Sequence, residues 1–328
     1  MNKCKILSQK HHKVMIGILL AAMLVFPLMG FSQYVYRIAV VSVLYAILAM
    51  SLNLIAGVAG QISLGHIAFY GIGAYTSALL CVNFDVSVWV GILAAFVVSM
   101  LFGLLIAIPT LKLSGGYLAI LTMSFAEIIR LILLNWTSVT RGPMGILNIP
   151  KPSLFGYTIK SSGAFLYLVL AVAIIVYIGL HNLIHSRFGR NLQALRDDEI
   201  SSESMGINVY RYKVIAFVIS TGVAGVAGAL FASYMEFIDP SSFISDESTV
   251  ILSMVVLGGM GNMNGSIIAA ALLTILPEAL RSFSDYRMLV YGVVLVAMML
   301  LKITDWAAIK RSLKTALNFK TGGKESGT

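Results

Sequence analysis

Charged residues are scarce in this chain: Asp, Glu, Lys and Arg make up 11% of its 328 residues, against about 25% in an ordinary soluble domain. Hydrophobic residues make up 59%, more than a soluble protein of this length can bury beneath a polar surface. Residues 14–31 and 38–82 contain no Asp, Glu, Lys or Arg at all. Because about 20 apolar residues cross the hydrocarbon layer as a helix, these runs predict a polytopic membrane protein.

Motifs of the common catalytic and nucleotide sites are also absent. The sequence has no G-x-x-x-x-G-K-[ST] phosphate loop, no H-E-x-x-H, no Cys-x-x-Cys and no G-x-S-x-G elbow, so we expect no catalytic residues, cofactor or metal site. Its two cysteines, Cys4 and Cys81, indicate no disulfide framework. The net charge of +9 comes from basic residues in short loops and at both ends, which argues against a nucleic acid partner.

The apolar residues predict an all-α integral membrane protein, a polytopic bundle of about ten hydrophobic segments, some discontinuous or re-entrant. The segments are 14–31, 35–56, 62–82, 86–108, 117–134, 165–184, 214–237, 250–260, 266–280 and 288–301. The short pair near 250–280 could be two extended crossings or one broken, re-entrant element. The membrane domain, 14–301, then lies between a basic leader, 1–13, and a basic tail, 302–328. Its first segment exceeds the apolar core of a signal peptide, so we expect a retained span.

Lysine and arginine predict the orientation, because cytoplasmic loops carry an excess of both. With ten crossings, the leader, the tail and the inside loops at 109–116, 185–213 and 261–265 hold 16 of the 23 basic residues, and the opposite side holds six. Counting 250–280 as one crossing would move the basic tail outside. We therefore expect both termini to be cytoplasmic.

Glycine and polar residues interrupt the apolar pattern between Asn53 and Tyr75, near membrane depth. Broken backbone and polar groups are tolerated there only inside protein or along a water-lined cavity. The stretch is either a discontinuous helix lining a transport path or a helix packed closely through small residues. On the first interpretation, its path residues are Asn53, Gln61, Ser63, His66 and Tyr75.

A second interruption occurs at 255–271, where four glycines lie around Asn262 and Asn264. Paired interruptions in the two halves of a chain point to a path between repeats, so both asparagines join the predicted path. Glu127 is the remaining candidate, because it and Arg130 are opposite charges at i, i+3 within one apolar segment. That ion pair could instead be structural, near a membrane boundary.

The long inside loop, 185–213, carries charges of both signs, which orientation alone does not require. Leu192, Leu195 and Ile200 are spaced for one helix face, and Gly206 is placed to end the helix. A short helix of mixed charge suits docking to a partner protein, and a plain solvated loop is the alternative. The charged candidates are Arg190, Arg196, Asp197, Glu199 and Glu203.

Four stretches resemble the permease subunits of branched-chain amino acid ABC importers, specifically the LivM type. They read GQISLGHIAFYGIGAY, GGYLAILTMSFAEIIRLILLNWTSVTRGPMGI, SRFGRNLQALRDDEISSESMGI and VVLGGMGNMNG. The similarity runs in order from about residue 35 to residue 301. It implies that Glu199–Gly206, in which Ser201 and Ser202 replace an Ala-rich family pattern, is a coupling loop that enters an ATPase.

The resemblance also implies the partners and the mechanism. Such a permease pairs with a second, homologous permease, docks two cytosolic ATP-binding subunits and receives substrate from an extracytoplasmic binding protein at the bacterial inner membrane. It works by alternating access and does not itself hydrolyse ATP. Leucine, isoleucine and valine are the default cargo, with urea, short amides and other amino acids left open. An ion-coupled secondary transporter is the rival, but it would place carboxylates along its path, and only Glu127 qualifies.

Overall fold

The computed structural model describes residues 32–110, 116–154, 157–159 and 161–279, together with residues 292, 293 and 296. Helices dominate this part of the chain, as the long uncharged segments predict. The α-helices are α2 (Gln33–Asn53), α3 (His66–Asn83), α4 (Val88–Thr110), α5 (Gly116–Asn135), α6 (Thr137–Thr140), α7 (Ser162–His185), α8 (Arg187–Asp197), α9 (Glu199–Ser204), α10 (Val209–Met235), α11 (Ser245–Gly258) and α12 (Met263–Ala279). The short elements are the π-helical turn η2 (Leu54–Val58), the 3-10 turns η3 (Gly142–Met144) and η4 (Pro240–Phe243), and the strands β1 (Ile146–Leu147), β2 (Ser153–Leu154), β3 (Tyr157–Thr158) and β4 (Phe237–Ile238).

Within the described residues, five helical stretches are long and apolar enough to cross a membrane. They are Gln33–Val58, Val88–Thr110, Gly116–Asn135, Ser162–His185 and Val209–Met235. Most of each of the predicted segments 62–82, 250–260 and 266–280 is also helical, in α3, α11 and α12 respectively. Segment 14–31 and nearly all of 288–301 lie outside the described residues, so the count of ten stays a prediction.

The two short segments have different bounds from those predicted. Helix α11 begins at Ser245, five residues before the apolar run, and its first turn contains Asp246 and Glu247, which complement the positive end of the helix dipole. Its 14 residues extend about 21 Å at about 1.5 Å per residue, short of the roughly 30 Å hydrocarbon layer. Helix α11 alone is therefore too short for a full crossing.

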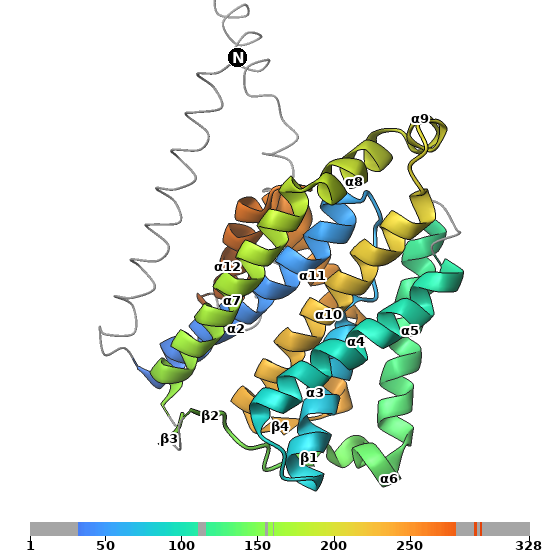
Figure 1. Cartoon of the computed structure of the whole chain (residues 1–328). Coiled ribbons are helices and arrows are strands. Elements are labelled where there is room, and N and C mark those ends of the chain that lie inside the picture. Colours follow the sequence, from blue (N-terminus) through green and yellow to red (C-terminus); the bar gives the residue numbers. More distant parts are fainter. Residues whose placement is uncertain are drawn as a thin grey trace, which may run out of the picture. The chain divides into compact units, whose positions relative to one another are not determined.

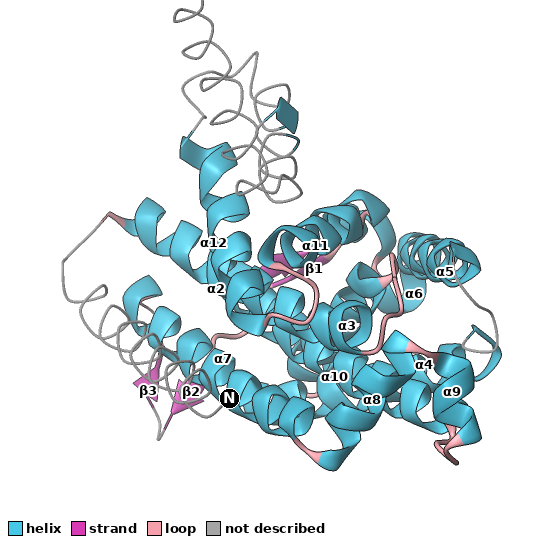
Figure 2. Ribbon diagram, turned by 90° about the horizontal axis from the view of Figure 1, so that it is seen from above, coloured by secondary structure: helices cyan, strands magenta, loops and turns pink. Residues whose placement is uncertain are grey.

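Helices α3 and α10 lie in the middle of the bundle, between α7 on one side and α5 on the other (Figure 2). Small residues bring them together: a Cβ at Gly73 would overlap the backbone of Gly225, and one at Gly228 would overlap the carbonyl of Tyr70. Close packing through small residues therefore describes this later part of the Asn53–Tyr75 stretch. The outer helices α4, α5 and α7 instead expose many apolar side chains.

The two ends of the bundle are built differently (Figure 1). Helices α8 and α9 lie at one end. At the other, β1 pairs antiparallel with β4, with Ile146 opposite Ile238, and β2 pairs antiparallel with β3. The indole Nε1 of Trp89 donates to the carbonyl of Ser153 at 2.7 Å. The described parts of the 135–163 loop therefore lie at the end opposite the 185–213 loop.

Candidate functional site

The first predicted interruption is a break in the helical backbone. Helix α2 widens into η2, and the chain is then non-helical from Ala59 to Gly65 before α3 begins at His66. Gly60 has φ +71°, a left-handed conformation that glycine adopts without a steric penalty. The amide of Gln61 donates to the carbonyl of Ile55 at 3.0 Å, which closes the wide turn.

The second predicted interruption lies beside the first. Helices α11 and α12 are separated by a turn in which Gly259 and Gly261 have φ of +99° and +85°. The amide of Gly261 donates to the side-chain Oδ1 of Asn53 at 2.8 Å. A Cβ at Gly57 would overlap both Asn53 Oδ1 and the amide of Gly261. Two interruptions that are 208 residues apart in sequence therefore meet in direct contact.

Arg196 joins the same point from the 185–213 loop. It lies in the last turn of α8, and its guanidinium Nη1 donates to the carbonyl of Gly57. Its side chain passes Gly60 and Gly261, where an added Cβ would come within 2.9 Å of Cγ and 3.3 Å of Nη1, respectively. We refer to Asn53, Gly57, Gly60, Arg196 and Gly261 as the helix-break junction.

Hydroxyl groups from neighbouring helices hold the non-helical backbone of the first break. Leu64 N donates to Thr122 Oγ1 at 3.0 Å, and Ile67 N donates to Ser248 Oγ at 3.2 Å. Ser51 Oγ lies 2.7 Å from His66 Nε2. Thr122, Ser248 and Ser51 are not among the residues predicted from the sequence. Isolated hydroxyl residues in apolar helices could have indicated them, because backbone groups inside a membrane need hydrogen-bond partners.

The predicted path residues of the first stretch are all buried. Asn53, Gln61, Ser63, His66 and Tyr75 are each at most 6% exposed. Several of their polar atoms have no hydrogen-bond partner among the described residues, namely Asn53 Nδ2, Gln61 Oε1, His66 Nδ1 and Tyr75 Oη. Unsatisfied polar groups in the buried interior are costly, and four of the six such side-chain atoms among the described residues belong to this segment.

The two asparagines of the second interruption make contacts of their own. Asn262 caps the start of α12, with Oδ1 accepting from Gly265 N at 3.3 Å. Asn264 Oδ1 accepts from the hydroxyl of Tyr177 at 2.9 Å, which ties α12 to α7. These two asparagines support the second interruption rather than lining the first.

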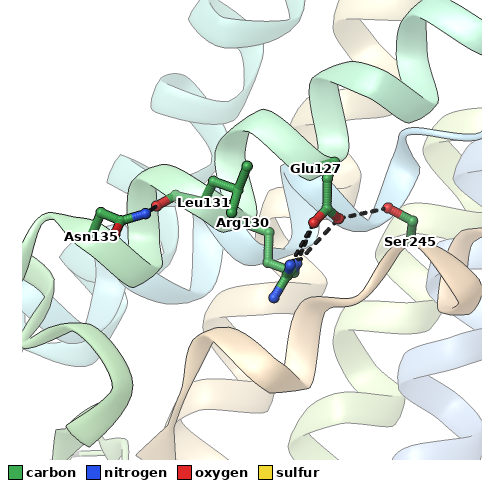
Figure 3. Close-up of polar contacts among 5 residues, drawn as sticks. All are labelled: Glu127, Arg130, Leu131, Asn135 and Ser245. Atoms are coloured by element: carbon green, nitrogen blue, oxygen red, sulfur yellow. Dashed lines mark hydrogen bonds and ion pairs between the residues drawn. The ribbon is translucent and has the colours of Figure 1, made fainter.

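Glu127 and Arg130 form the expected ion pair within α5, with Oε1 and Nη2 2.5 Å apart. Ser245 Oγ, at the start of α11, donates to Glu127 Oε2 at 3.4 Å (Figure 3). The pair is partly exposed, at 25% for the arginine and 43% for the glutamate. This geometry supports the structural interpretation, in which the pair ties α5 to α11.

The 185–213 loop contains two helices instead of one. Asp198 ends α8 and caps α9, since its Oδ1 accepts from Ser201 N at 3.0 Å. This bond and one from the Ser201 hydroxyl hold the pKa of the Asp198 carboxyl below its ordinary value. The chain turns at the cap, so the prediction that Ile200 shares a face with Leu192 and Leu195 is wrong: both leucines are buried and Ile200 is 80% exposed.

The remaining candidates of this loop face outward, with one exception. Arg190, Asp197, Glu199, Ser201, Glu203 and Gly206 are exposed, and Ser202 is buried. Lys213 Nζ pairs with Glu199 Oε2 at 2.6 Å. Gly206 ends the segment as predicted, with φ +83°. A cavity of about 610 Å³ lies here, lined by Glu199, Glu203, Gly206, Ile207, Asn208, Val209 and Tyr210.

Apolar spanning helices, two interruptions in direct contact and the 185–213 loop joined to them define a membrane transport protein of the broken-helix class. The chain belongs to the family described as "Branched-chain amino acid transport system / permease component", whose model matches residues 34–300.

The curated relatives agree with this family. The chain is 39% identical over 316 residues to the high-affinity branched-chain amino acid transport system permease protein LivM of Salmonella typhimurium, covering 89% of this chain and 74% of that protein. LivM of Escherichia coli K12 matches with the same identity and coverage. LivH of E. coli K12 is 26% identical over 296 residues, covering 84% of this chain and 94% of that protein. No solved structure gives a significant match.

Proposed function

We propose that this permease component is the membrane-spanning subunit of an ATP-driven importer that moves leucine, isoleucine and valine by alternating access. The observation that carries the proposal is the contact between Arg196 and the carbonyl of Gly57. It connects the one large inside loop directly to the backbone of a broken helix, so a movement of the loop reaches the transport path without an intermediate element.

The surface around α9 supports docking of an ATP-binding subunit. Ile200 and Met205 are 80% and 84% exposed, and they flank the acidic cavity that contains Glu199 and Glu203. Exposed apolar side chains beside charged groups fit a partner groove with an apolar floor and a charged rim. ATP hydrolysis then occurs on the partner, and this chain is a transport subunit rather than an enzyme.

The proposed assembly contains this chain, a second homologous permease, two ATP-binding subunits and an extracytoplasmic substrate-binding protein in the bacterial inner membrane. Similarity of the chain to both LivM and LivH supports a pair of homologous permeases. Both termini are cytoplasmic in this arrangement, as the basic residues predict. The buried polar residues near the helix-break junction form part of the path.

Replacing Ile200 by aspartate tests the docking surface. We expect the ATP-binding subunit to be lost on co-purification from native membranes, because a buried, unpaired carboxylate opposes an apolar contact. Gly206→Asp should have the same effect, since φ +83° strains any side chain there. Met144→Asp, another 81% exposed apolar residue at the opposite end, is the control. Full retention of the ATPase by Ile200→Asp would contradict the proposal.

Gln61→Ala and His66→Ala test the path. Each removes a buried polar group that has an atom without a partner among the described residues. If that atom bonds to the substrate during transport, we expect ATP-dependent leucine uptake to fall about tenfold, which corresponds to one hydrogen bond of about 1.4 kcal/mol. Size-exclusion chromatography of each variant complex checks that the loss of uptake does not come from failed assembly. An unaltered transport rate in both variants would remove these residues from the path.

A further inference from the structure

A second cavity lies at the end of the bundle opposite α8 and α9. Its volume is about 570 Å³, and its lining combines charged residues of both signs with aromatic ones: Arg37, Lys151, Ser162, Phe231, Tyr234, Met235, Glu236, Phe237 and Ser242. Helix α10 connects the two ends of the bundle (Figure 1), with Val209 near the first cavity and Met235 near the second. Its 27 residues place them about 40 Å apart.

The charges of this cavity suit a zwitterion. Lys151 Nζ pairs with Glu236 Oε1 at 2.6 Å, yet Glu236 remains 53% exposed. Arg37 forms no ion pair within the described part of the chain. The charges of Lys151 and Glu236 cancel, so Arg37 gives the cavity a net positive charge that attracts a carboxylate. The exposed carboxylate of Glu236 offers an acceptor to an ammonium group.

The aromatic residues continue inward from the cavity. The ring of Phe231 lies 5.3 Å from that of Tyr70 and 6.3 Å from that of Phe243. Phe243 in turn lies 6.0 Å from Tyr75, whose buried hydroxyl has no partner among the described residues. An apolar side chain that enters the cavity therefore contacts aromatic rings, and the buried hydroxyl of Tyr75 lies behind Phe243.

We propose that this cavity binds a free amino acid with an apolar side chain and is the entry site of the permease. Arg37 binds the α-carboxylate, Glu236 binds the α-ammonium, and Phe231 and Tyr234 contact the side chain. The assignment deepens the proposed function and rests on it for the identity of the cargo. Because the site contacts the carboxylate and the ammonium group as well as the apolar side chain, it should select a zwitterion over a ligand that lacks either charge.

Equilibrium binding of radiolabelled leucine to the full chain in lipid nanodiscs tests the site. We expect Arg37→Gln to weaken leucine binding about tenfold or more, the loss typical of a charge-assisted hydrogen bond. Arg37→Lys should restore part of the affinity. Arg141→Gln, an exposed arginine of the 135–163 loop that does not line the cavity, is the matched control. Leucinamide, which lacks the carboxylate, should compete poorly with leucine on the wild-type chain and as well as leucine on Arg37→Gln.

Several results would overturn the site. They are no leucine binding to the wild-type chain, an affinity of Arg37→Gln within twofold of wild type, or equal competition by leucine and leucinamide. Loss of the extracytoplasmic binding protein from Arg37→Gln, with leucine affinity unchanged, would assign the cavity to protein docking instead. ATP-dependent uptake by the wild-type complex is measured in parallel. If the wild-type complex shows ATP-dependent uptake but Arg37→Gln binds leucine normally, only the proposed site is wrong. If the wild-type chain binds leucine but the complex shows no ATP-dependent uptake, only the proposed function is wrong.

Discussion

Arg196→Gln is expected to reduce ATP-dependent leucine uptake by roughly ten- to a hundredfold, while ATP hydrolysis by the complex continues. The guanidinium donates a charge-assisted hydrogen bond to the carbonyl of Gly57, and such bonds contribute about 1.5–3 kcal/mol. If this contact transmits the movement of the inside loop, its loss removes a coupling free energy of that size. The assay is uptake and ATPase activity in the same proteoliposomes.

Arg187→Gln is the matched control for Arg196. Arg187 lies at the other end of the same helix, is exposed, and belongs to the same loop. Both variants remove one positive charge from α8, and only Arg196 donates to the carbonyl of Gly57. Equal uptake by Arg196→Gln and Arg187→Gln would show that the arginine serves orientation or surface charge and not coupling.

Gly57→Ala is expected to abolish uptake and to lower the free energy of unfolding by about 1–3 kcal/mol, the usual cost of overpacking a well-packed site. The added methyl group would overlap Asn53 Oδ1 and the amide of Gly261, and so force the two interruptions apart. Thermal unfolding of the purified chain in detergent, followed beside uptake, measures both effects.

Gly179→Ala separates this steric effect from a general effect of alanine in a helix. Among the described residues, nothing lies within 4 Å of a Cβ at Gly179 in α7, so we expect normal uptake and a stability gain of about 0.5–1 kcal/mol. A Gly57→Ala chain as active and as stable as Gly179→Ala would show that the contact between the interruptions is dispensable.

Most of the spanning helices could be predicted from the sequence, because a long uncharged run in a membrane satisfies its backbone hydrogen bonds best as a helix. Segments 86–108, 117–134 and 165–184 differ by at most three residues at either end from α4, α5 and α7. The interruptions were also predictable as local features, because glycines and amides inside an apolar run break its pattern. Their contact was not, because no local pattern specifies that Asn53 meets Gly261.

The prediction for the 185–213 loop was limited for a different reason. Helical spacing placed Ile200 with Leu192 and Leu195, but the side chain of Asp198 caps a new helix and ends that spacing. The sequence indicates Arg196 only as a charged residue of a docking loop. In the structure its guanidinium donates to the carbonyl of Gly57. Glycines at positions 60 and 261 leave room for that side chain, a condition set by residues far away in the sequence.

Leucine uptake by the purified complex in proteoliposomes tests the central claim most directly. ATP inside or outside the vesicles and an imposed proton or sodium gradient are varied independently, with the extracytoplasmic binding protein present. The account predicts that uptake requires ATP on the side of α8 and α9 and proceeds without any ion gradient. Uptake driven by an ion gradient in the absence of ATP, by a chain that purifies alone, would contradict it and indicate a secondary transporter.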